Sequence, residues 1–156
     1  MCSSDLLRAA CDSRTRAIFV ASPSNPTGWV MSQDEQRELL DFARERGIWI
    51  IADEVYHRIV YEGKTVPSFL QLAEPDDRLY VVHSFSKAYC MTGWRCGFLV
   101  HPADLGRQLG DLSGINNTGS ATFVQHAAVA ALTHGEPFVE TVVDHCRRGQ
   151  IGRAHV

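Results

Sequence analysis

The first third of the chain combines short apolar runs with a segment of helical pattern. Residues 17–21 and 48–52 are apolar runs, the second of them unbroken as in strands that are covered on both faces of a sheet. Between them, Ser32 and Glu35 have the spacing of a helix-capping box, and Gly47 favours a helix end. The pattern therefore predicts a strand–helix–strand unit in which the two strands run parallel.

Further apolar runs extend the predicted sheet. We expect strands at 79–82 and 97–100, and the short link between them favours an antiparallel pair. The segment 62–77 contains Gly and Pro and predicts a long connection with one helical turn. Helical spacing predicts three more helices, within 103–112, 123–132 and 136–143. The expected fold class is α/β: a three-layer sandwich fragment with a mostly parallel sheet, one antiparallel strand and helices on both faces.

Composition narrows the possible partners. A chain of 156 residues with 45% hydrophobic content is long enough for one folded core. Its formal net charge of −3 gives no reason to expect nucleic acid or an anionic membrane as a partner. No apolar stretch approaches the roughly 20 residues of a membrane span. We therefore expect neither a nucleic-acid nor a membrane partner.

Cysteine and histidine positions suggest no metal or disulfide framework. The five cysteines contain no C-x-x-C pair, which predicts free, buried thiols in a reducing compartment and a cytoplasmic protein. His57 and His83 lie near the motifs described below, but neither forms a metal-ligand spacing. We expect all seven histidines to be hydrogen-bonded or solvent-facing, and no bound metal.

Chemically useful side chains follow three of the predicted strands. Asn25-Pro26-Thr27-Gly28 follows the first strand, Asp53-Glu54-Val55-Tyr56 the second, and Ser84-Phe85-Ser86-Lys87 the third. Ligands of open α/β sheets bind beyond the carboxyl ends of the strands, so these motifs are expected to form one site. Arg95 follows the third motif closely and supplies a guanidinium.

Each of these features alone has an ordinary explanation. The first motif is a common β-turn, and Asp53-Glu54 could mark a strand end ahead of a helix, where the helix dipole favours carboxylates. A single lysine is usually solvated, and a single arginine often forms a structural ion pair. The combination in one order is what favours a functional site.

The combined motifs resemble those of the class I/II aminotransferases of pyridoxal phosphate (PLP) fold type I. The resemblance extends over residues 15–132, and the pattern S-x-x-K followed by M-x-G-x-R-x-G matches without a gap. It implies PLP as the cofactor, and an amino acid and a 2-oxo acid as substrates. It also implies transfer of the amino group between them through a Schiff base on Lys87.

The resemblance implies a role for each motif residue. Lys87 forms the Schiff base and acts as general base and acid, while Asp53 pairs with the pyridine nitrogen. Tyr56 completes the catalytic set, and Glu54 stays outside it as a supporting residue or a charge at a helix N-terminus. The implied contacts to the cofactor's phenolate oxygen come from Asn25 and Tyr56, and those to its phosphate from Ser84, Arg95 and, more weakly, Ser86.

Other interpretations share the same residues. A PLP-dependent carbon–sulfur lyase or synthase of this fold would carry every motif above. The same domain also serves as an aminotransferase-like effector module in some transcription regulators, and a truncated reading frame would have no activity of its own. The resemblance further implies a homodimer in the full-length protein.

The two ends of the chain differ from the rest. Segments 1–6 and 151–156 can be back-translated into opposite strands of one oligonucleotide that resembles a sequencing-library adaptor. We therefore expect both segments to be adaptor-derived and exclude them from the fold. Residues 7–150 are expected to form part of a PLP-binding large domain, whose native termini are not seen.

Overall fold

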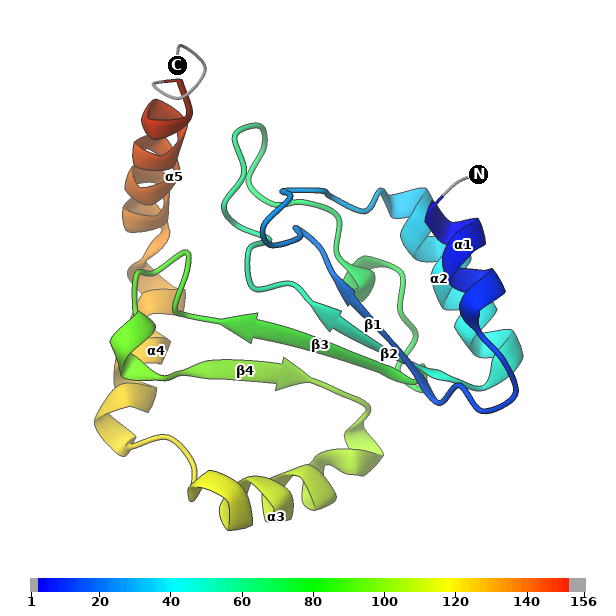
Figure 1. Cartoon of the computed structure of the whole chain (residues 1–156). Helices are drawn as coiled ribbons and strands as arrows, with labels where there is room; N and C mark the ends of the chain where they lie inside the picture. The colour runs from blue at the N-terminus through cyan, green and yellow to red at the C-terminus, as the bar shows by residue number, and fades with distance from the viewer. Residues whose placement is uncertain (1–2, 152–156) are drawn as a thin grey trace.

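A computed structural model describes residues 3–151 and contains one mixed sheet (Figure 1). Its strand order is β1-β2-β3-β4, where β1, β2 and β3 are parallel and β4 pairs antiparallel with β3. The strands are β1 (Ala17–Ala21), β2 (Trp49–Asp53), β3 (Leu79–Ser84) and β4 (Gly97–Val100). This confirms the predicted mostly parallel sheet with one antiparallel strand. The proposed adaptor segments lie partly outside the described residues.

Helix α2 (Gln33–Arg46) forms the crossover between β1 and β2, as predicted. The Ser32 hydroxyl accepts a hydrogen bond from the Glu35 backbone N–H at 3.3 Å, and the Glu35 carboxylate accepts one from the Ser32 N–H at 2.8 Å. At the other end, Gly47 adopts a left-handed conformation with φ 63°, which a residue without Cβ reaches at little cost. These two local signals set the bounds of the helix.

The main core lies between α2 and one face of the sheet. Along β1, Ile18 and Val20 are buried, whereas Phe19 between them is 65% exposed. The apolar run at β2 likewise alternates between buried and partly exposed residues, so the expectation of strands buried on both faces is wrong for these residues. A uniformly apolar strand does not encode which face will be covered. Within residues 3–151, the Phe19 side chain has no such cover. The principal core residues are Ile18, Val20, Leu39, Leu40, Ile50, Ala52, Phe69, Leu79 and Val81.

The remaining helices lie around the sheet. Helices α4 and α5 lie near the end of the sheet where β3 finishes, and α3 lies beyond β4 (Figure 1). The predicted helix at 103–112 is divided into a short 3-10 turn and α3, and the predicted helical turn in 62–77 is present as η1. No helix within residues 3–151 has both the length and the apolar character needed to cross a bilayer. The bounds are α1 (Ser3–Ala10), η1 (Phe69–Gln71), η2 (Thr92–Trp94), η3 (Ala103–Leu105), α3 (Gly106–Asn117), α4 (Thr122–His134) and α5 (Glu136–Ile151).

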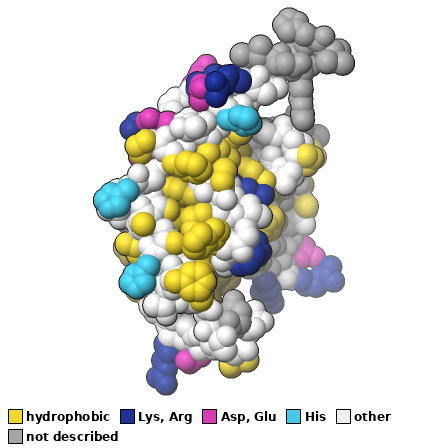
Figure 2. Space-filling model, turned by 90° about the vertical axis from the view of Figure 1, so that its left-hand side faces the viewer, with side chains coloured by type: hydrophobic (Ala, Val, Ile, Leu, Met, Phe, Trp, Pro, Cys, Tyr) yellow, Lys and Arg dark blue, Asp and Glu magenta, His cyan; other side chains and the backbone are white. Residues whose placement is uncertain are grey.

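One side of the molecule carries a band of hydrophobic side chains with basic side chains beside it (Figure 2). Large apolar residues are exposed on β4, where Phe98, Leu99 and Val100 are all more than a third accessible.

The four cysteines within the described residues are free, as predicted, but none is fully buried and Cys90 is exposed. Cys90 lies in the turn after β3 rather than on a strand, which explains why the expectation of burial is wrong there.

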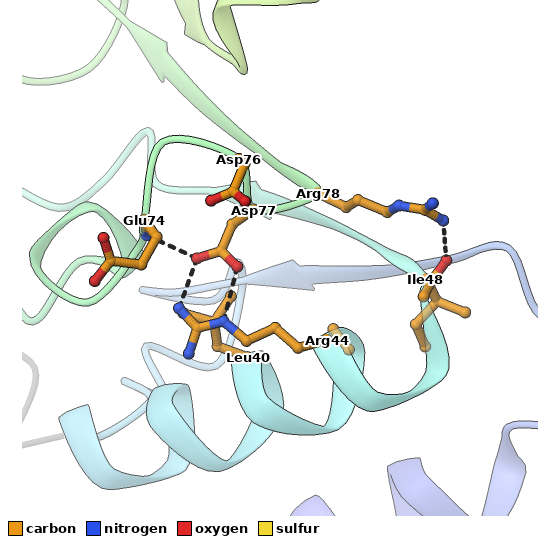
Figure 3. A pocket seen from close by; sticks show the side chains of 9 residues that line it. Leu40, Arg44, Ile48, Glu74, Asp76, Asp77 and Arg78 are labelled. Carbon is orange, nitrogen blue, oxygen red and sulfur yellow. Dashed lines mark hydrogen bonds and ion pairs between the residues drawn. The ribbon is translucent and has the colours of Figure 1, made fainter.

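An ion pair connects α2 to the residues just before β3, at the end of the sheet opposite the predicted site (Figure 3). Two nitrogens of the Arg44 guanidinium donate to the two carboxylate oxygens of Asp77, each at 2.7 Å. The backbone N–H of Glu74 donates to the same carboxylate at 2.7 Å. Arg78 adds a hydrogen bond to the Gly47 carbonyl oxygen. The arrangement fixes the crossover helix against the sheet and therefore contributes to stability.

Candidate functional site

The three turns that carry the sequence motifs begin at the same end of the sheet. In the strand register, Ala21 lies opposite Asp53, and Asp53 lies opposite Val82. The chain segments after β1, β2 and β3 therefore begin side by side at the carboxyl ends of parallel strands. This is the position at which open α/β sheets bind ligands.

The turn after β1 places Asn25 in the lining of a pocket. Ser22 holds the base of the turn, because its N–H donates to the Asp53 carbonyl oxygen at 3.0 Å and its hydroxyl accepts from the Met31 N–H at 2.9 Å. Asn25 is exposed and lines a pocket of about 630 Å³ that Tyr56 also lines. The structure thus brings these two predicted residues to one cavity.

The segment after β2 forms turns rather than the helix considered in the sequence analysis. Asp53 is half-buried, and its carboxylate accepts a hydrogen bond from the Val55 N–H at 3.1 Å. Because Asp53 lies opposite Val82 and side chains alternate along a strand, Asp53 and Ser84 point to the same face of the sheet. The hydrogen bond from the Val55 N–H fixes the direction of the Asp53 carboxylate.

The turn after β3 carries Lys87 and is held by a buried anchor. Phe85 is only 2% exposed and packs with Met91 and Ala128. The Ser84 hydroxyl accepts from the Ser86 N–H at 3.1 Å, which draws these two hydroxyl-bearing residues together. The Nζ atom of Lys87 lies 5.1 Å from the centre of the Tyr56 ring, within the range of a cation–π contact. The second and third motifs therefore meet at Lys87 and Tyr56.

Arg95 lies in the loop that connects β3 to β4. Thr92 links the two parts of this loop, since its hydroxyl donates to the Ser86 carbonyl oxygen at 3.0 Å and its own carbonyl accepts from the Arg95 guanidinium at 3.2 Å. Gly97 permits the close pairing that follows, because a Cβ there would lie 2.5 Å from the His83 carbonyl oxygen. Arg95 is exposed, and a guanidinium has five N–H donors, so it can donate further hydrogen bonds to a ligand.

Glu54, His57 and His83 form a polar cluster beside the Asp53 turn that was not predicted from the sequence. Glu54 is 1% exposed, one of its carboxylate oxygens accepts from the Phe69 N–H at 3.0 Å, and the other has no partner. His83 is 7% exposed and forms a hydrogen bond with the Glu54 backbone, whereas its Nδ1 has no partner. The alternation of side chains along a strand could have predicted the burial of both residues, since Glu54 lies two positions after the core residue Ala52 and His83 two positions after Val81.

Burial changes the proton affinity of this cluster. It raises the pKa of the Glu54 carboxyl, because the charged form loses hydration. Burial, together with the neighbouring His83, lowers the pKa of His57 to about 4. The His57 and His83 rings lie 4.5 Å apart, and the His57 Nδ1 lies 2.9 Å from the Glu54 carbonyl oxygen. A neutral His57 is therefore part of the support for the Asp53–Tyr56 turn.

Comparison with known proteins identifies the family. The family model for aminotransferase class I and II matches residues 2–152. The chain belongs to this aminotransferase family. Among curated relatives of the family, the aromatic-amino-acid aminotransferase 2 of Thermococcus litoralis is 38% identical over 130 residues, which cover 83% of this chain and 33% of the relative. The probable aspartate/prephenate aminotransferase of Aquifex aeolicus is 38% identical over 120 residues, covering 76% and 30%.

Solved structures of aminotransferases have the same fold. The aromatic aminotransferase from Pyrococcus horikoshii OT3 superposes with a TM-score of 0.86 at 33% sequence identity, over 95% of this chain and 40% of that one. The present chain thus spans about a third of the length of the curated relatives that it matches. Within residues 3–151, no cluster of His, Cys, Asp and Glu has the arrangement of a metal site.

Proposed function

We propose that this chain is part of a PLP-dependent aminotransferase that transfers an amino group between an amino acid and a 2-oxo acid. The observation that carries the proposal is the meeting of Lys87 with Tyr56, at 5.1 Å between the amine nitrogen and the ring centre, at the strand edge that Asn25 and Asp53 share. On this proposal, residues 7–150 are a native segment of the large domain of a longer enzyme.

The side chains at this edge match the functional groups of PLP. A carboxylate (Asp53) suits a protonated pyridine nitrogen, and an amide with a phenol (Asn25, Tyr56) suits a phenolate oxygen. The Ser84 hydroxyl and the Arg95 guanidinium suit a phosphate, with Ser86 beside them. Lys87 supplies the amine for the aldehyde. Every polar group of the cofactor thus has a partner of the right chemistry in this chain.

The protein residues would divide the chemistry as follows. Bound PLP supplies an aldehyde that takes up amino groups and an electron-poor ring that stabilises negative charge at the substrate's α carbon. Lys87 would act first as a general base, accepting the proton from the substrate's α carbon, and then as a general acid, donating it to the carbon of the cofactor. Asp53 would keep a positive charge on the ring nitrogen, and Arg95 would fix the phosphate through two parallel hydrogen bonds.

The proposal also covers the substrate, the oligomeric state and the cellular compartment of the full-length enzyme. The named relatives act on aromatic amino acids or on aspartate and prephenate, so we assign the substrate only as an amino acid with its 2-oxo acid. The full-length enzyme is proposed to be a homodimer, with no nucleic-acid or membrane partner. Free cysteines within the described residues suit a reducing compartment, which favours the cytoplasm.

Borohydride reduction of the full-length, PLP-loaded enzyme tests the proposal. A pyridoxyl mass should appear on the peptide that contains Lys87, and Lys87→Ala should abolish both the label and the visible absorption of the bound cofactor. Lys64 is the matched control, because its side chain is 78% exposed and lies in a loop. Label on Lys64, or an unchanged spectrum in Lys87→Ala, would refute the assignment. Release of ammonia or sulfide, instead of amino transfer to a 2-oxo acid, would indicate a lyase.

A further inference from the structure

Arg58 lies two positions after Tyr56 and joins three segments of the chain. One of its terminal nitrogens donates to the Glu136 carboxylate, and the other donates to the Tyr89 hydroxyl at 3.3 Å. Glu136 is the first residue of α5, and Tyr89 lies two positions after Lys87. A single guanidinium therefore connects the Tyr56 turn, the Lys87 turn and the start of α5.

Tyr89 fits tightly between the Lys87 turn and the corner where α4 meets α5. Its ring centre lies 5.4 Å from that of Phe85, the buried anchor of the turn. On the other side is Gly135, where an added Cβ would lie 2.9 Å from a ring carbon of Tyr89. The hydroxyl that Arg58 uses is thus held by packing on both sides.

The start of α5 is also fixed. Val139 is 3% exposed, and its N–H donates to the Gly135 carbonyl oxygen at 3.0 Å. From this point α5 extends beyond the sheet (Figure 1). A displacement of α5 would therefore act on Glu136 and, through Arg58, on the turn that carries Tyr56.

Two cations face Glu136, and their exposure decides between them. The Arg58 side chain is 20% exposed, whereas the Lys64 side chain is 78% exposed and its Nζ lies 4.0 Å from the other carboxylate oxygen. The shared Glu136 carboxylate is 42% exposed, so the cation that is better shielded from water is the one that interacts with it more strongly. The Nε of Arg58 is buried without a partner, so this side chain has given up hydration to occupy its place. Arg58 is therefore the cation that matters for Glu136.

We propose that Arg58 is a positioning residue that sets the Tyr56 ring relative to the Lys87 amine and makes both turns responsive to α5. The inference rests on the proposed function for its consequence in catalysis, but the physical coupling of the two turns does not depend on the cofactor. An arginine is needed because its planar fork reaches two acceptors in different directions, which a single ammonium at the end of a flexible stem does not reproduce.

Backbone hydrogen exchange in the cofactor-free, full-length protein tests the coupling directly. The reporters are the Ile59 N–H, bonded to the Tyr56 carbonyl oxygen at 2.9 Å, and the Cys90 N–H, bonded to the Lys87 carbonyl oxygen at 3.1 Å. Arg58→Met should accelerate exchange by about tenfold or more in the peptides of both turns, because charged hydrogen bonds that restrain them are lost. Lys64→Met, which removes the solvated cation from the same carboxylate, should leave both unchanged.

Spectroscopy and kinetics of the PLP-loaded enzyme test the consequence for the site. Arg58→Met should lower kcat by roughly 10- to 100-fold, the range expected when a reacting group is misplaced, with KM altered much less. It should also shift the pH at which the visible absorption of the Lys87-bound cofactor changes. Arg58→Lys should recover only part of this loss, and Lys64→Met should match the unsubstituted enzyme.

Two gentler variants keep the proposal testable if Arg58→Met does not fold. Glu136→Gln removes the charge and keeps the shape, and Tyr89→Phe removes the accepting oxygen and keeps the ring. Each should accelerate exchange in both turns. Faster exchange in the Tyr56 turn alone, or an unchanged kcat and spectrum despite lower thermal stability, would overturn the positioning role. Absence of borohydride label on Lys87 in the unsubstituted enzyme would instead refute the proposed function, and the exchange result would stand separately.

Discussion

The amine nitrogen of Lys87 lies 5.1 Å from the centre of the Tyr56 ring, although Lys87 lies in the turn after β3 and Tyr56 in the turn after β2. The contact depends on the parallel register of β2 and β3, which starts both turns at neighbouring positions. It also depends on the buried Phe85, which holds the Lys87 turn against α4. Tyr56 is therefore the residue whose substitution most directly tests the geometry of the site.

Loss of the Tyr56 hydroxyl should weaken PLP binding, and loss of the whole ring should weaken it further. In the full-length enzyme, Tyr56→Phe should raise the Kd for PLP by about 10- to 100-fold, the cost of a hydrogen bond to a charged oxygen. Tyr56→Leu should raise it further, because the ring that faces Lys87 is also lost. Tyr61→Phe is the control, since Tyr61 lines the same pocket but has no predicted cofactor contact. Equal losses in Tyr56→Phe and Tyr61→Phe would contradict the assignment of Tyr56.

Removal of the Asp53 carboxylate should slow proton transfer without preventing attachment of the cofactor to Lys87. Asp53→Ala in the full-length enzyme should still give the borohydride label on Lys87. Deprotonation of the substrate α carbon should be slower by roughly 10²–10³-fold or more, because a fixed charge that stabilises a developing carbanion is lost. Single-turnover kinetics separate this step from binding. A near-normal rate of proton transfer would place Asp53 away from the ring nitrogen.

The contact between Gly97 and His83 predicts a sensitive position in β4. Gly97→Ala would place a methyl group 2.5 Å from the His83 carbonyl oxygen, so the two strands must separate beside Ser84. We expect a loss of stability of about 1–3 kcal/mol, typical of forced overpacking, together with weaker PLP binding. Gly93→Ala, in the loop before β4, adds a methyl group that meets nothing within 4 Å and should be tolerated. Thermal unfolding and PLP titration of both variants would reveal whether the strain is local to Gly97.

The Arg44–Asp77 ion pair predicts a specific acid sensitivity. Hydrogen bonds from Arg44 hold the pKa of Asp77 below its ordinary value of 3.8. The stabilisation is therefore complete above about that ordinary value and is lost as the pH falls through the lower pKa of the folded state. Asp77→Asn should remove this component of the acid transition.

Neutral-pH stability gives a second readout of the same ion pair. Asp77→Asn should lower the free energy of unfolding by about 1–3 kcal/mol, because the Asp77 carboxylate, only 7% exposed, no longer accepts charged hydrogen bonds from Arg44. Asp76→Asn is the matched control, since the neighbouring Asp76 is exposed. If the two variants had the same unfolding midpoint from neutral to acidic pH, the ion pair would not be the source of the stability.

Local patterns in the sequence determined the elements and their order. Ser32, Glu35 and Gly47 set the bounds of α2 because capping hydrogen bonds and the left-handed glycine act within a few residues. The apolar runs located all four strands, and the short link before Gly97 indicated the antiparallel pair. The motif residues could be identified for the same reason, since their order along the chain is a local property. Their chemical roles remain predictions.

Only the tertiary structure decided which residues meet and which faces are covered. Phe19 and Ile18 are equally apolar, yet one is exposed and the other buried, because coverage depends on where α2 packs. The hydrogen bond from the Phe69 N–H to the buried Glu54 carboxylate joins residues 15 positions apart, so the sequence could suggest the burial of Glu54 but not its partner. Arg58 and Glu136 are separated by 78 positions, and their contact arises from the packing of α5 against the site turns. Such contacts have no local signature, because they result from the summed packing of elements that are distant in the sequence.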